Sequence, residues 1–66
     1  SEQNLPLARC MLILKDCKEN GVSNNDIKNI LGTKYGKTKI EELRIDQAED
    51  FQKYVNDPNL DLSGYL

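Results

Sequence analysis

Helix-ending residues recur along this chain of 66 residues and leave only short stretches between them. Gly21 is a common C-terminal signal, because glycine readily adopts the left-handed conformation that ends a helix. A second helix ends at Gly32 or Gly36, two glycines that leave its boundary open. A third ends before Pro58, since the residue that precedes a proline is disfavoured in helical geometry. A chain divided in this way can form a few short helices but no long one.

The apolar residues between these stops recur at three- and four-residue spacing, which is typical of amphipathic helices. Pro6 suits the first position of the first helix, where its missing N–H costs nothing. Ala8, Leu12 and Ile13 widen the stripe of that helix beyond one face. The first helix is therefore either the central element of the core or exposes an apolar strip. The stripe residues are Leu7, Cys10, Met11, Leu14 and Cys17 in the first helix, Ile27, Ile30 and Leu31 in the second, and Ala48, Phe51, Tyr54 and Val55 in the last.

Three capping-box patterns mark where helices begin. In each, a short polar residue is followed three positions later by an acidic one, so that the two can satisfy backbone N–H groups reciprocally. Ser23 with Asp26 opens the second helix, residues 38–41 open a short turn through Leu43, and residues 46–49 open the last helix. The sequence therefore predicts an all-α fold, a compact bundle of three main helices plus a short helical turn, with an irregular C-terminal tail.

The tail, residues 58–66, is acidic and apolar without a helical period, and it follows a small helical domain over residues 1–57. Its apolar side chains either fold back over the broad stripe of the first helix or form an exposed docking peptide. We favour folding back, because a domain of this size buries only about 60% of its unfolded surface and needs the additional area. A tail that stays away leaves an apolar patch on the first helix, which invites self-association. The apolar tail residues are Leu60, Leu62, Tyr65 and Leu66.

The composition argues against an enzyme and against a metal or cofactor site. The chain has no histidine, the commonest general base and metal ligand near neutral pH. A fold of this size also leaves no room for an enclosed substrate cavity of the usual volume. Cys10 and Cys17 stand two helical turns apart, about 10.5 Å, which is too far for a disulfide. Reduced cysteines indicate an intracellular setting, and the apolar run 7–14 is too short to span a membrane.

The net charge of −2 hides an uneven distribution of charged residues. Residues 26–44 hold five basic groups against three acidic ones, which gives +2, whereas residues 45–66 hold one against five, which gives −4. Lysines of the loop 33–39 can neutralise anionic groups, and Tyr35 can stack on a base. The plainer interpretation is that these lysines solvate a loop and that Tyr35 packs on the core. The candidate partner-binding residues are Lys28, Lys34, Tyr35, Lys37, Lys39 and Arg44, and we expect neighbouring apolar residues of the first and last helices to complete the surface.

A series of short motifs spans the second half of the chain. They are Lys34-Tyr35-Gly36, Glu42-Leu43, Asp46-Gln47-Ala48 and Phe51. This order resembles the small C-terminal helical domains attached to bacteriophage single-strand annealing recombinases. The resemblance covers residues 21–55, about half of the chain, and departs from the pattern at Arg44, where a threonine usually caps the last helix. It implies an accessory domain that contacts a single-strand DNA-binding protein or an exonuclease, with a secondary role in holding DNA.

These observations predict a non-catalytic protein-interaction module of a phage or mobile-element DNA recombination or replication protein, in the cytoplasm of a bacterial host. The expected partner is a recombination or replication protein whose acidic groups complement the basic residues. One alternative is direct binding of single-stranded nucleic acid through residues 34–39, although a pI near 4.9 is unusual for such domains. Another is a stand-alone small regulator that docks on a host protein through the acidic last helix and tail. No metal or cofactor is expected, and the oligomeric state stays open.

Overall fold

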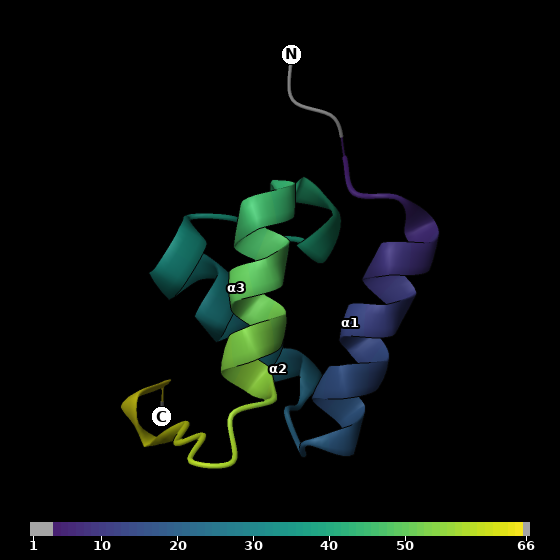
Figure 1. Ribbon diagram of the computed structural model, residues 1–66. Coiled ribbons are helices and arrows are strands. Elements are labelled where there is room, and N and C mark those ends of the chain that lie inside the picture. The colour runs from purple at the N-terminus through teal and green to yellow at the C-terminus, as the bar shows by residue number, and fades with distance from the viewer. Residues whose placement is uncertain (1–3, 66) are drawn as a thin grey trace.

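Three α-helices form the bundle in the computed structural model, which describes residues 4–65 (Figure 1). They are α1 (Leu7–Glu19), α2 (Asn24–Ile30) and α3 (Ile45–Val55). A π-helical turn, η1 (Leu31–Tyr35), continues α2. Of two 3₁₀ turns, η2 (Ile40–Glu42) precedes α3 and η3 (Ser63–Tyr65) lies in the tail. No strand occurs between residues 4 and 65. The all-α fold expected from the sequence is confirmed.

The first helix ends as its glycine predicts, but it starts one residue later than its proline suggests. Pro6 has an extended ψ of 146° and stands before the helix, where its carbonyl accepts the N–H groups of Arg9 and Cys10 at 3.0 and 3.1 Å. At the other end Gly21 has a φ of 72°, in the left-handed region. The Val22 N–H can therefore turn back to the Cys17 carbonyl at 2.8 Å, which closes the last turn.

The second helix begins at the predicted capping box. The Asp26 N–H donates to Ser23 Oγ at 3.1 Å, and the Ser23 N–H donates to Asp26 Oδ2 at 3.0 Å. Gly36 ends the segment with a φ of 65°, and its N–H donates to the Leu31 carbonyl. Gly32 lies inside the π-helical turn and has no positive φ. The open choice between the two glycines is thus decided by which of them adopts the left-handed conformation.

Two capping residues differ from the sequence prediction. Glu42, rather than Glu41, closes the turn before α3, because its carboxylate accepts the Thr38 N–H and hydroxyl at 2.9 Å and the Lys39 N–H at 3.0 Å. The last helix starts at Ile45, so that Asp46 lies in its first turn rather than at its cap. At the cap stands Arg44, whose N–H donates to Gln47 Oε1 at 3.0 Å.

The core lies around α3, which has neighbours on several sides. Asp16 of α1 accepts hydrogen bonds from the side chains of Gln52 and Asn56, both at 3.1 Å. On the side of η1, the ring of Tyr35 packs edge-on against Phe51, with 6.1 Å between ring centroids. The largest fully buried side chains are Phe51, Ile13, Ile30, Leu31, Leu43, Val55 and Cys17.

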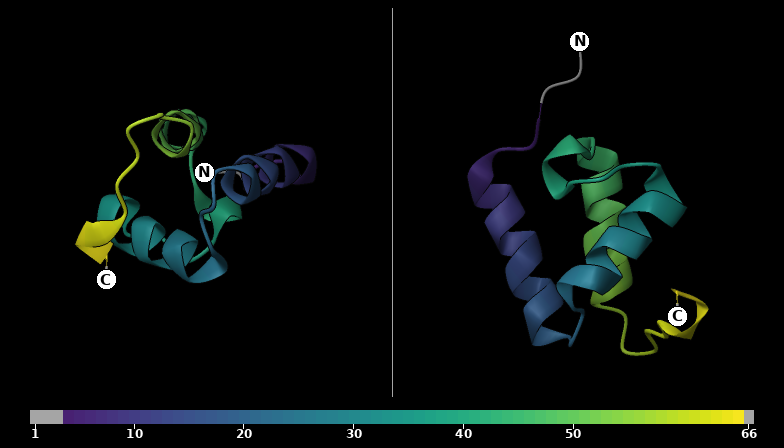
Figure 2. Two further views of the ribbon diagram at one scale, coloured as in Figure 1. Left: turned by 90° about the horizontal axis from the view of Figure 1, so that it is seen from below. Right: turned by 180° about the vertical axis from the view of Figure 1, so that it is seen from behind.

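The tail packs against α2 and α3 and lies away from α1. Its carbonyl at Tyr65 accepts a hydrogen bond from the Asn29 side chain at 3.4 Å, and the hydroxyls of Tyr54 and Tyr65 are 3.3 Å apart. Leu60 and Leu62 are partly buried against the core, whereas Leu66 falls outside the described residues. Figure 2 shows α1 at one edge of the molecule and the tail at the other. The tail therefore packs on α2 and α3 instead of folding back over α1 as expected, and Leu7, Met11 and Leu14 of α1 stay exposed.

Candidate docking groove

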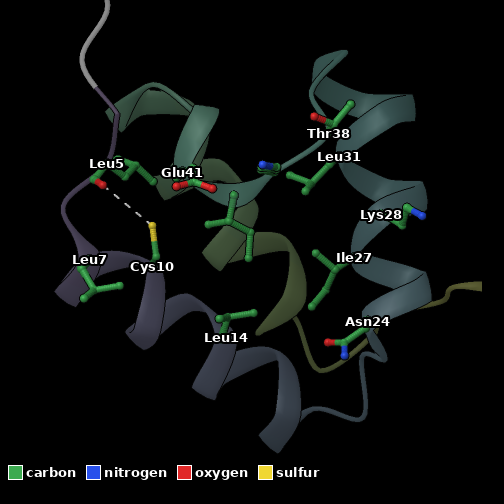
Figure 3. A pocket seen from close by; sticks show the side chains of 12 residues that line it. Leu5, Leu7, Cys10, Leu14, Asn24, Ile27, Lys28, Leu31, Thr38 and Glu41 are labelled. Atoms are coloured by element: carbon green, nitrogen blue, oxygen red, sulfur yellow. Dashed lines mark hydrogen bonds between the residues drawn. The ribbon is translucent and has the colours of Figure 1, made fainter.

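An open groove of about 400 Å³ runs between α1 and α2 and is bounded at one end by η2 (Figure 3). It exists because the two helices take different partners: α1 packs on α3 and η2, whereas α2 packs on η1 and η3. The floor is apolar and includes Leu5, Cys10, Ile27, Leu31 and Ile40. These floor residues are buried members of the core, so the floor of the groove is the edge of the core itself.

One wall of the groove is a face of α1. Leu7 and Leu14 stand on either side of Cys10 at helical spacing and line the groove. Leu7 is 75% exposed and Leu14 is 44% exposed, although both are large aliphatic residues. Exposed apolar surface that adjoins a groove is typical of a protein-interaction site.

The opposite wall and the end of the groove carry charge. Lys28 projects from α2, Lys39 stands just before η2, and Glu41 lies within η2 beside Leu5, whose N–H donates to the Glu41 carbonyl at 2.9 Å. Both lysines are exposed. Two cations beside an apolar floor complement a ligand that combines large apolar side chains with carboxylates.

Two of the six candidate residues, Lys34 and Tyr35, face α3 instead of the groove. The Tyr35 hydroxyl donates to Asp50 Oδ2 at 2.6 Å, and burial together with this hydrogen bond raises the pKa of Tyr35 above its usual value of 10. Lys34 Nζ lies 3.9 Å from the same carboxylate and 4.5 Å from the centre of the Tyr54 ring. These contacts give both residues a structural role, because they join η1 to α3.

The remaining candidates, Lys37 and Arg44, do not line the groove either. The backbone N–H of the half-buried Lys37 donates to the Leu31 carbonyl at 3.1 Å. Arg44 is exposed, and its Nε donates to Asp46 Oδ1 at 3.2 Å, which holds the pKa of that carboxyl below its usual range. The structure therefore brings only Lys28 and Lys39 together with the groove.

The apolar residues of the groove were expected only as unnamed neighbours from the first helix, and those of the second helix were not expected. Leu5, Leu7, Leu14 and Ile27 line the groove, but the list of candidate residues was built on charge and on an aromatic ring. A signal was present in the breadth of the apolar stripe on the first helix, which is wider than one buried face. That breadth indicates exposed apolar surface without saying which neighbours border it.

The groove contains one of the two cysteines of the chain. Its one thiol is that of Cys10, which is buried with Sγ 3.9 Å from the Leu5 carbonyl, and burial raises its pKa. Burial likewise raises the pKa of Cys17, one of the buried residues of α1, to about 11. Both thiols are therefore protonated near neutral pH and act as small apolar groups.

Within residues 4–65 no group of three or more His, Cys, Asp or Glu side chains is placed to hold a metal ion. The same part of the chain contains no helix with the length and apolar character needed to cross a membrane. Comparisons of the chain with protein-family models, with curated proteins and with solved structures find no match.

Proposed function

We propose that this chain is a non-catalytic protein-interaction module and that the groove between α1 and α2 binds a peptide segment of a partner protein. The observation that carries the proposal is the combination of an apolar floor, made of core residues, with Lys28 and Lys39 at the rim. A segment with one or two large apolar side chains and nearby carboxylates fits both features. Apolar anchors supply most of the affinity in such complexes, and charges orient the ligand.

The resemblance over residues 21–55 supports a more specific assignment. On that ground we propose an accessory domain of a phage or mobile-element recombination or replication protein, with a single-strand DNA-binding protein or an exonuclease as partner. An acidic peptide with an apolar end is the ligand that both the resemblance and the groove favour.

Direct nucleic-acid binding gains no support from the positions of its candidate residues. The Tyr35 ring packs on Phe51 and its hydroxyl is held by Asp50, so that stacking on a base would require both contacts to break. The basic residues are also spread over different faces instead of following one continuous track.

Binding of a fluorescent peptide, acidic and ending in two large apolar residues, tests the proposal by anisotropy. Lys28→Glu and Lys39→Glu should each weaken binding about threefold or more, because an exposed charge pair is worth up to about 1 kcal/mol and reversal adds repulsion. Lys53→Glu makes the same charge change on α3, away from the groove, and should leave the affinity unchanged. Equal effects of all three variants would contradict the proposal. So would binding of single-stranded oligonucleotide, but not peptide, with a steep salt dependence.

A further inference from the structure

One face of α1 remains without a partner along its whole length. Leu7, Met11 and Leu14 are 75%, 61% and 44% exposed, and Lys18 follows them on the same line. These four positions are separated by four, three and four residues, the alternation with which two helices pair along a seam. Leu12 and Ile45, the other exposed large apolar residues, stand singly and away from this line.

The face is complementary to itself in an antiparallel arrangement. Glu41 lies beside Leu5, at the end of the face where α1 begins, and Lys18 lies in its last turn. A two-fold axis near Met11 would place Leu7 of one copy opposite Leu14 of the other. The same axis would bring Lys18 of each copy to the Glu41 end of its partner. The unlike charges at the two ends of the face therefore meet when two copies pair.

We propose that a second copy of this chain is the occupant of this face, in an antiparallel pair of α1 helices that forms when no partner peptide is bound. A single pair of helices of 13 residues buries less surface than the 1,200 Å² or so at which stable interfaces begin, so the dimer is weak and reversible. The charges at its ends select the antiparallel register over the parallel one, in which like charges would meet.

This dimer bears on the proposed function, because Leu7 and Leu14 belong both to the face and to the groove. A bound peptide and a second copy would therefore compete, and the peptide should shift the protein towards monomer. Met11 does not line the groove, and Lys28 and Lys39 are not on the α1 face, so the two proposals can be tested separately.

Sedimentation equilibrium over a range of protein concentrations measures the pairing. The apparent mass of the full chain should rise from 7.5 kDa towards twice that value. Met11→Glu puts two like charges at the axis and should weaken the dimer about tenfold or more. Leu12→Glu is the matched control, an equally drastic change at an exposed apolar residue of the same helix, and should leave the mass curve unchanged.

Charge reversal at the ends tests the register. Lys18→Glu should weaken the dimer about threefold, the size expected for an exposed ion pair, and Lys18→Glu combined with Glu41→Lys should restore it. The proposal is overturned by a mass that stays at 7.5 kDa at the highest concentration, by equal effects of the Met11 and Leu12 variants, or by failed restoration in the double variant. Circular dichroism confirms that each variant is helical, and peptide binding by Met11→Glu shows that its groove is intact.

Discussion

The two long helices of this bundle each bury three residues, but α1 leaves more large apolar side chains exposed than α3 does. In α3 the buried residues Ala48, Phe51 and Val55 are all 0% exposed, whereas in α1 Leu7 and Met11 are mostly exposed. The difference comes from position: α3 has α1, η1 and the tail as neighbours, and α1 stands at the edge. A domain of this size buries only about 60% of the surface of its unfolded chain, and here part of the remaining apolar surface lies on the edge helix.

The contact between these two helices sharpens the contrast. On the side of α1 that faces α3, the C-terminal parts of the two helices are joined by side-chain hydrogen bonds. Gln52 and Asn56 donate to Asp16, and Asn20 donates to Asn56. On the other side of α1, the groove separates it from α2. The two sides of α1 thus differ in their contacts: one is bonded to α3, and the other lines the groove.

The largest test of this contrast compares one residue from each helix. Phe51→Ala should lower the free energy of unfolding by about 3–5 kcal/mol, the usual cost of removing a buried aromatic ring. Leu7→Ala should change it by less than about 0.5 kcal/mol, as expected for an exposed position. Urea unfolding followed by circular dichroism measures both. A Leu7 variant as unstable as the Phe51 variant would show that the α1 face is not open.

A smaller effect on the free energy of unfolding is expected at high pH, from the buried Cys17 of α1. Cys17 is 1% exposed, and burial raises the pKa of its thiol from 9.0 to about 11. Because the folded pKa exceeds the unfolded one, this contribution to stability is fully present below pH 9 and is lost as the pH rises through 11. This pKa difference corresponds to about 3 kcal/mol in all, of which about 2 kcal/mol is lost by pH 11.

Urea unfolding at pH 7, 9 and 11 checks this expectation on the wild type and on Cys17→Ala. The stability difference between the two proteins should shrink by about 2 kcal/mol over that range, while the titration of other groups affects both alike. A constant stability difference would mean that water reaches the Cys17 thiol in the folded protein.

The smallest effects are expected at the two glycines of the π-helical turn η1 and its end. Gly36→Ala should destabilise the domain by about 1 kcal/mol, because its φ of 65° is strained for a residue with a Cβ. Gly32→Ala should stabilise it by about 0.5 kcal/mol, because alanine loses less backbone entropy in a helical turn. No atom lies within 4 Å of either added Cβ, so packing does not obscure the comparison. Thermal unfolding midpoints should move in opposite directions, and a shift of the same sign would contradict this assignment.

The predictable part of the fold consists of features with local causes. The stop at Gly21 and the capping box of Ser23 depend on residues within one turn, and both occur as the sequence indicates. The partner of Thr38 and the cap of α3 were assigned one or two residues away from their true places. Neighbouring acidic residues such as Glu41 and Glu42 are equivalent local partners in sequence, and the structure uses Glu42, whose carboxylate also reaches the Lys39 N–H.

The candidate site was less predictable, because it depends on which faces meet. Charge and an aromatic ring placed Lys34, Tyr35 and Lys39 in one predicted binding site. In the structure Lys34 and Tyr35 turn towards Asp50 on α3, and only Lys39 reaches the groove. A few residues along a turning backbone are enough to reverse the direction of a side chain. No sequence pattern reports which of two neighbouring lysines will meet a carboxylate 16 residues further along the chain.

By itself the sequence determined an all-α domain with short helices, their main stops and a first helix with more apolar surface than one face can hide. Only the tertiary structure decided which surface remained open. The tail is held by Asn29 and Tyr54, so it covers the side of α2 and α3 and leaves α1 exposed. The reason is physical: helix starts and stops depend on backbone bonds within one turn, whereas an open groove depends on contacts between residues far apart in the chain.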